Sequence, residues 1–185
     1  MRTFVALNLT DAARSGLHAA LAPLRETSLP LRWLDPTTLH VTIRFLGETA
    51  ADSVPRIEEV LRSAAQRRTP IDLRISGVGA FPSLRRANIV WVGVAADEQL
   101  SALYRELEPA LSRLGFPREQ RPFRPHITVG RVRGSARPPD IERVAGRVQC
   151  EAVEQVQTVD LMRSWPGPEG SRYETLLKCR LGGGA

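Results

Sequence analysis

The chain of 185 residues lacks several features that would place it in a specialised class. It has no apolar run approaching the ~20 residues that a membrane-spanning helix needs, and only two cysteines, Cys150 and Cys179, without metal-ligand spacing. Its 42% hydrophobic and 25% charged content excludes a disordered chain, a fibrous repeat and a coiled coil. The sequence therefore predicts a globular protein of single-domain size, with the two cysteines as core thiols on late strands.

Lysine is nearly absent, because Lys178 is the only lysine among 26 basic residues in a chain of net charge +6. Codon bias in a GC-rich genome would explain an arginine-rich composition. An anionic partner such as nucleic acid would also explain it, since guanidinium groups bind phosphates through paired hydrogen bonds. Composition leaves both explanations open. The first apolar run is too short for a signal peptide, so we expect a cytoplasmic protein.

Hydrophobic periodicity predicts strands and helices along the whole chain. We expect strands at 1–9, 39–46, 71–78, 88–94, 125–132, 153–163 and 173–181, and helices at 11–25, 53–67, 97–114 and 140–147. The second half resembles the first in its order of elements, and no low-complexity linker separates the halves. The pattern predicts an α+β fold, with residues 1–185 forming one domain of two related lobes.

Two short segments share one pattern, HVTI beginning at His40 and HITV beginning at His126. On a strand, residues i and i+2 share a face. Thr42 therefore lies beside His40 and Thr128 beside His126, while the β-branched neighbours face the core. The chain has only three histidines, and the third, His18, has no such partner and is expected on the surface.

Two imidazoles and two hydroxyls at one opening suit phosphodiester cleavage. One imidazole can deprotonate the attacking water while the other protonates the departing oxygen, and the hydroxyls can bind the non-bridging oxygens. A zinc site would need a third donor, but Asp35 and Glu48 lie beyond the first of these strands. A Ser-His-Asp hydrolase is disfavoured because the chain has no G-x-S-x-G motif. We expect no metal and no other cofactor.

The segments HVTIRFLGE and RPFRPHITVGR resemble the two signature strands of the 2H phosphoesterase superfamily. The closer resemblance is to RNA 2′,3′-cyclic phosphodiesterases, historically called 2′–5′ RNA ligases. It extends through RTFVALNL, RWLDPTTLHVTIRFLG, FPSLRRANIVWVGV and LMRSWPGPEGSRYETL, and so through nearly the whole chain. It implies two pseudo-symmetric lobes, each an antiparallel sheet with outer helices, on either side of a central active-site cleft.

The resemblance also implies an activity, the opening of 2′,3′-cyclic phosphates at RNA 3′ ends to leave 2′-phosphates. His40 would be the proton donor to the leaving 3′ oxygen and His126 the proton acceptor that activates water. Thr42 and Thr128 would hold the phosphate. Relatives also join RNA ends reversibly through 2′–5′ bonds without ATP. The expected partners are RNA ends such as tRNA fragments, bound by a monomer that needs no membrane.

Two arginines are candidates for substrate binding. By strict alternation Arg44 shares a face with the first histidine, as Arg124 does with the second, whereas Arg131 points away unless its strand bends at Gly130. The family resemblance favours Arg131, although relatives more often continue T-L-A-R where this chain has T-V-G-R. Strand period favours Arg44. Both remain candidates.

Aromatic residues make up only 5% of the chain, which favours recognition of an RNA end over a long single strand. Stacking can contribute ~1–3 kcal/mol per base. Most of the aromatic candidates are expected in the core, Phe45 because it lies on the face opposite Thr42, and Trp91 because its strand is apolar. The candidates for base stacking are Phe4, Trp33, Phe45, Trp91 and Tyr173.

Two other functions remain open at this point. One is the same chemistry on a different small cyclic phosphate, which mononucleotide and oligonucleotide substrates would separate. The other is a non-catalytic RNA-binding module, for which affinity would depend on salt but not on the type of 3′ phosphate. The two matched histidines argue against a pure binder, which has no need of an acid and base pair.

Overall fold

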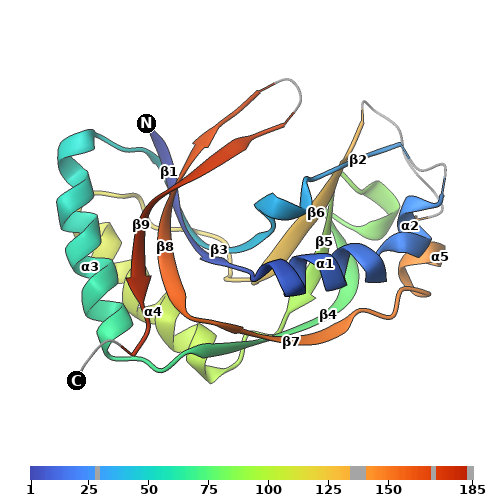
Figure 1. The fold of residues 1–185 in the computed structure, drawn as a ribbon. Coiled ribbons are helices and arrows are strands. Elements are labelled where there is room, and N and C mark those ends of the chain that lie inside the picture. Colours follow the sequence, from blue (N-terminus) through green and yellow to red (C-terminus); the bar gives the residue numbers. More distant parts are fainter. Residues whose placement is uncertain (28–29, 134–140, 168–169, 183–185) are drawn as a thin grey trace.

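In the computed structural model, which describes residues 1–27, 30–133, 141–167 and 170–182, one antiparallel sheet is flanked by helices (Figure 1). The strands are β1 (Arg2–Asn8), β2 (Leu31–Trp33), β3 (His40–Glu48), β4 (Ile71–Phe81), β5 (Ile89–Val94), β6 (His126–Val132), β7 (Glu151–Val156), β8 (Thr158–Trp165) and β9 (Arg172–Arg180). The helices are α1 (Asp11–Ala20), α2 (Ala22–Arg25), α3 (Val54–Gln66), α4 (Glu98–Arg113) and α5 (Ile141–Ala145), with short 3-10 turns η1 (Pro36–Thr38), η2 (Ala51–Ser53) and η3 (Leu84–Arg86). None of these helices is long and apolar enough to cross a membrane.

The sheet has the strand order β7-β4-β5-β6-β3-β1-β8-β9, with β2 paired to β6. Its middle is a seam, because β3 and β6 are paired through Val41 and Ile127 alone, whereas β1 and β3 are paired along seven positions. The seam divides the sheet into two halves, and each half begins there with one of the His-x-Thr strands. The predicted α+β class and antiparallel halves are confirmed, although the halves belong to one continuous sheet.

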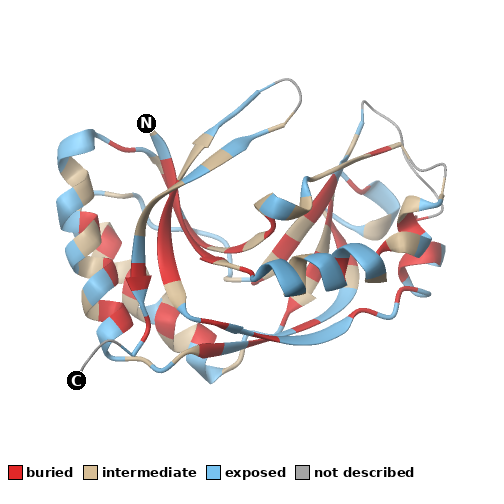
Figure 2. Cartoon of the chain, viewed as in Figure 1, coloured by how far each residue is buried: buried red, intermediate tan, exposed pale blue. Residues whose placement is uncertain are grey.

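Apolar stripes on the helices position them against the sheet. In α4 the buried residues Leu100, Leu103, Leu107 and Leu111 recur at helical spacing, and the Asp97 side chain caps the helix by accepting from the Leu100 N–H. Helix α3 packs on α4, β8 and β9, while α2 and α5 contact each other. Figure 2 shows the buried residues concentrated in the strands and on the inward faces of these helices.

Two predicted elements differ from the structure, and one observed strand has no predicted counterpart. The single strand expected at 153–163 is wrong, because the chain leaves the sheet at Gln157 and forms two strands, β7 beside β4 and β8 beside β1. The helix expected at 11–25 is interrupted at Leu21, ahead of Pro23. Strand β2 was not predicted, since three residues are too few to show a period.

The remaining expectations concern the cysteines and the chain ends. Cys150 and Cys179 are both buried free thiols, as predicted, with Cys179 inside β9 and Cys150 just before β7. The first residue of the helix expected at 140–147 and the tail beyond residue 182 lie outside the described residues. The buried residues of both halves belong to one main hydrophobic cluster. That residues 1–185 are a single domain stays a prediction.

Candidate active site

The two His-x-Thr motifs meet across the seam of the sheet. Because β3 and β6 run antiparallel with Val41 opposite Ile127, His40 lies toward Thr128 and Thr42 toward His126. All four side chains line one cavity of about 410 Å³. The seam therefore creates a two-fold arrangement, in which each half contributes one imidazole and one hydroxyl.

Each imidazole is held by a backbone carbonyl two residues before it, just ahead of its strand. Nδ1 of His40 lies 2.7 Å from the Thr38 carbonyl oxygen, and Nδ1 of His126 lies 2.7 Å from the Arg124 carbonyl oxygen. A carbonyl oxygen can only accept, so Nδ1 carries a proton in both rings. Nε2 is then left to accept or donate a proton. The same backbone contact thus fixes the same tautomer in both histidines.

Aromatic rings surround His40 in the first half. Its ring centroid lies 4.9 Å from that of Phe4 and 5.2 Å from that of Tyr173, which meets it edge-on. Burial among these rings shields the imidazole from water and so lowers the pKa of His40 to about 4, while the hydrogen bond to Thr38 opposes the shift. His40 is thus neutral at pH 7 in the unliganded protein. An anion bound beside it would favour the protonated form.

A second pair of rings holds His126 in the other half. The Phe81 ring meets it edge-on with centroids 5.0 Å apart, and Trp91 lies 6.0 Å away. Trp91 can lie over its neighbouring strand only because residue 79 is glycine, since a Cβ at Gly79 would overlap the indole ring. Trp91 was expected in the core, but it faces the site.

A β-bulge follows the threonine of each motif. In β3 the pairing to β1 passes from Thr42 to Arg44, leaving Ile43 unpaired, and in β6 the pairing to β5 passes from Thr128 to Gly130, leaving Val129 unpaired. The extra residue places two successive side chains on the buried face. The two residues after each unpaired position, Arg44 and Phe45 in β3 and Gly130 and Arg131 in β6, are thereby on the face opposite to the one that simple alternation predicts.

The bulges decide where the two candidate arginines lie. The expectation that Arg44 shares the face of His40 is wrong, because the bulge turns it away from the cleft, where it is buried and forms an ion pair with Glu108 of α4. Arg131 lines the cavity with both histidines. Phe45, expected in the core, is instead 60% exposed and also lines this cavity.

Several residues near the site were not identified from the sequence. Phe81 lies at the end of β4, three residues beyond residue 78, where the predicted strand ends. Asn8, the cross-strand neighbour of His40, donates to the buried carboxylate of Asp160 over 2.6 Å. Burial raises the pKa of Asp160, and the Asn8 hydrogen bond opposes this. For Asn8 the signal is its position, since it follows Phe4 and Ala6 at alternate positions of β1 and so shares their face.

The acidic residues that flank the first motif have structural roles. Asp35 caps η1 by accepting from the Thr37 backbone N–H at 2.9 Å, and Glu48 lies 3.4 Å from the N-terminal amine of Met1. Within the described ranges, no three His, Cys, Asp or Glu side chains gather as metal ligands do. That the site works without a metal stays a prediction.

Comparison with known proteins identifies the family. Residues 7–164 match the model of the 2′-5′ RNA ligase superfamily, and the chain belongs to that family. An RNA 2′,3′-cyclic phosphodiesterase of Methanothermobacter thermautotrophicus is 32% identical over 183 residues, covering 98% of this chain and 99% of the relative. One from Archaeoglobus fulgidus is 32% identical, covering 95% of this chain and 98% of the relative.

Solved structures agree with this assignment. A crystal structure of a Thermus thermophilus protein superposes with a TM-score of 0.84 at 27% identity, covering 99% of both chains. Escherichia coli LigT, solved in complex with 3′-AMP, superposes with a TM-score of 0.75 at 25% identity, covering 97% of both chains. The family and the fold predicted from the sequence are confirmed.

Proposed function

We propose that this protein is a phosphodiesterase that hydrolyses 2′,3′-cyclic phosphates at RNA 3′ ends to 2′-phosphates. The matched histidines are the observation that carries the proposal. Both present Nε2 from a fixed tautomer, and both line one cavity with the two threonines. Relatives named RNA 2′,3′-cyclic phosphodiesterase, similar over nearly the whole chain, support the choice of substrate.

The reaction uses one histidine on each side of the phosphorus. Nε2 of His126 takes a proton from water as the water oxygen bonds to phosphorus, and Nε2 of His40 gives a proton to the 3′ oxygen as its bond to phosphorus breaks. The 2′ ester bond remains, so the product is a 2′-phosphate. With an RNA 5′-hydroxyl in place of water, the same steps form a 2′–5′ bond.

The other cavity residues bind the phosphate. The hydroxyls of Thr42 and Thr128 donate hydrogen bonds to the non-bridging oxygens, where charge increases in the transition state. The Arg131 guanidinium adds a charge-assisted contact. The bound phosphate also raises the pKa of His40 from its value in the unliganded protein, because a nearby anion favours the imidazolium. Substrate binding thereby prepares the acid for its role.

The first test uses EDTA-treated protein and a short RNA ending in a 2′,3′-cyclic phosphate, with the product identified by phosphorus NMR. His40→Ala and His126→Ala should each lower kcat about 10²–10⁴-fold, the range expected for a general acid or base. His18→Ala is the matched control, because this histidine lies on α1 and pairs with Arg25 outside the cavity.

Each outcome of this test has a definite meaning. Conversion to a 2′-phosphate that is lost in both cavity variants and retained in the control supports the proposed mechanism. If the protein binds the RNA but does not open its cyclic phosphate, the remaining interpretation is a non-catalytic RNA-binding module. If it hydrolyses cyclic mononucleotides but not RNA, its substrate is another cyclic phosphate. Activity that EDTA abolishes would contradict the metal-free mechanism.

We further propose that the enzyme acts in the cytoplasm as a monomer, on RNA ends such as those of tRNA fragments. The proposed reaction needs only residues of one chain, since all the named groups line a single cavity. Light scattering coupled to size-exclusion chromatography at assay concentration tests the monomer. A dimeric mass would contradict this part of the proposal.

A further inference from the structure

A groove of about 660 Å³ adjoins the catalytic cavity on the side of His126. Three residues, Thr42, Phe45 and His126, line both spaces, so the groove opens directly into the cavity. His40 and Thr128 line the cavity but do not belong to the described lining of the groove. The groove therefore meets the active site at only one of its two imidazoles. We call this space the His126 groove.

The His126 groove lies where the two motif strands separate. Strands β3 and β6 are paired only through Val41 and Ile127. Residues 42–45 of β3 line one part of the groove, and residues 121–124, which lead into β6, line another. Helix α4 and the end of β4 also contribute to the lining. An occupant would thus touch both halves of the sheet.

Aromatic side chains are concentrated in this groove, although they make up only 5% of the chain. Those in the lining are Phe45, Phe81, Tyr104 and Phe123. The rings of Tyr104 and Phe123 are stacked, with their centroids 4.2 Å apart and their planes 3° from parallel, so α4 holds Phe123 in place. Aromatic walls and a volume of this size favour a small ligand with a planar ring, such as a nucleobase.

The charged side chains of the lining carry both signs. Arg44 forms the buried ion pair with Glu108 described above. Glu119 lines the same space as Arg121 and Arg124. A lining of mixed charge suits a neutral nucleoside better than a phosphate group alone.

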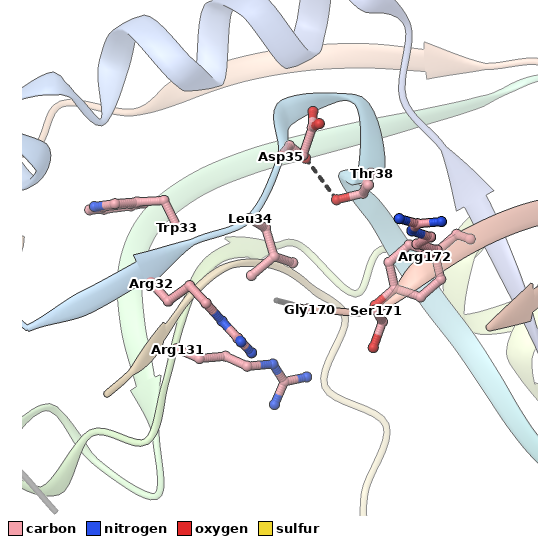
Figure 3. A pocket seen from close by; sticks show the side chains of 10 residues that line it. Arg32, Trp33, Leu34, Asp35, Thr38, Arg131, Gly170, Ser171 and Arg172 are labelled. Atoms are coloured by element: carbon pink, nitrogen blue, oxygen red, sulfur yellow. Dashed lines mark hydrogen bonds between the residues drawn. The ribbon is translucent and has the colours of Figure 1, made fainter. Parts of the chain in front are cut away.

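The groove lies on the side from which the nucleophile attacks. In the proposed mechanism His126 takes a proton from the attacking oxygen and His40 gives one to the departing 3′ oxygen, and these two oxygens are roughly in line across the phosphorus. The smaller hollow of about 210 Å³ in Figure 3 adjoins the opposite side, because it is lined by Thr38 and Tyr173, which both contact His40. The 3′ oxygen departs toward that side, so the His126 groove is open to the attacking group.

We propose that the His126 groove binds the nucleoside whose 5′-hydroxyl replaces water when two RNA ends are joined. Its base stacks on the aromatic lining, and its 5′-hydroxyl lies beside Nε2 of His126. The 5′ oxygen bonds to phosphorus and gives its proton to His126, while the bond from phosphorus to the 3′ oxygen breaks and His40 protonates that oxygen. A water molecule needs no such groove. This inference rests on the proposed function and adds to it the site of the second RNA end.

The test uses a short RNA that ends in a 2′,3′-cyclic phosphate and has its own 5′-hydroxyl methylated, so that it serves only as the donor. Two acceptors compete at equal concentration, 2′,3′-dideoxyadenosine and tetrahydrofurfuryl alcohol. Both present one hydroxymethyl group on the same tetrahydrofuran ring, but only the first has a base. The readout is the ratio of the two phosphodiester products by mass spectrometry, which does not depend on the fraction of folded protein.

We expect the unmodified protein to prefer the acceptor with a base about tenfold or more, the effect of stacking one base. Phe123→Ala and Tyr104→Ala should each bring the ratio several-fold closer to one, whereas Phe123→Tyr, which keeps the ring, should keep the ratio. Phe116→Ala is the matched control. Phe116 also packs partly buried against the main hydrophobic cluster, but it belongs to the described lining of neither the groove nor the cavity.

The possible failures are distinguishable. If the unmodified protein hydrolyses the donor but transfers it to neither acceptor, or to both equally, the His126 groove is not an acceptor site and the proposed function stands. The same conclusion follows if the ratio survives in both alanine variants of the groove, or if Phe116→Ala lowers it as much as they do. If the donor is neither hydrolysed nor transferred, the proposed function itself fails.

Discussion

The two motif strands are alike as far as their bulges and differ beyond them. Both hold a histidine by Nδ1 and then bulge after the threonine. In β3 the bulge is followed by Arg44 on the buried face and Phe45 on the cleft face. In β6 it is followed by Gly130 on the buried face and Arg131 on the cleft face. The shared part carries the two histidines and two threonines that we propose for catalysis, whereas the divergent part gives one side of the cleft an aromatic ring and the other a positive charge.

The largest expected effect separates the arginine of the first strand from that of the second. Arg44→Ala should lower the free energy of unfolding by about 3 kcal/mol, because it removes the buried partner of the Glu108 carboxylate, whose side chain is only 15% exposed. Urea denaturation measures this. The double variant Arg44→Met with Glu108→Leu should recover most of the loss, and a single variant as stable as the unmodified protein would contradict the structural role.

Arg131→Ala should show the opposite behaviour. This arginine is exposed at the cleft, so the free energy of unfolding should change by less than about 0.5 kcal/mol. Loss of a charge-assisted contact to phosphate should lower kcat/KM about 100-fold. Steady-state kinetics beside a denaturation curve tests both. If Arg131→Ala unfolded the protein, the two arginines would not differ as proposed.

The burial of His40 should make the stability of the protein depend on pH in the acidic range. Its pKa is lowered from 6.5 to about 4 in the folded protein, so between these values the unfolded chain binds more protons. Stability therefore increases with pH from about 4 to 6.5 and is lost on acidification through that range. His40→Gln removes this proton difference, so its Tm should fall less than that of the unmodified protein between those pH values. Parallel Tm curves in calorimetry would contradict it.

The smallest expected effect concerns the aromatic side of the cleft. Phe45 is 60% exposed and its ring lies 6.0 Å from that of Phe4. Phe45→Ala should barely change stability but should raise KM for an oligonucleotide several-fold, if the ring stacks on a base. Phe45→Tyr, which keeps the ring, is the matched control. Equal KM values for the two variants would remove Phe45 from substrate binding.

The sequence predicts the shared part of the two strands better than the divergent part. Alternation alone placed His40 and Thr42 on one face, as it did His126 and Thr128, because no bulge lies between the members of either pair. It failed for Arg44 and Phe45, since a bulge depends on pairing with a neighbouring strand and has no period of its own. Alternation also fails to predict the break at Gln157, where β7 ends and β8 begins. No glycine or proline marks this point in the sequence, so the two strands look like one.

The single pairing of Val41 with Ile127 has a consequence for how this family can diversify. Each half of the sheet positions its own histidine and threonine, whereas the spacing between the two imidazoles depends on how the halves pack at this pairing, at the pairing of β2 with β6 and in the shared core. Substitutions that repack this joint would widen or narrow the gap without altering any residue that touches the substrate. Evolution could in this way adapt the two histidines that we propose for proton transfer to phosphates of different bulk.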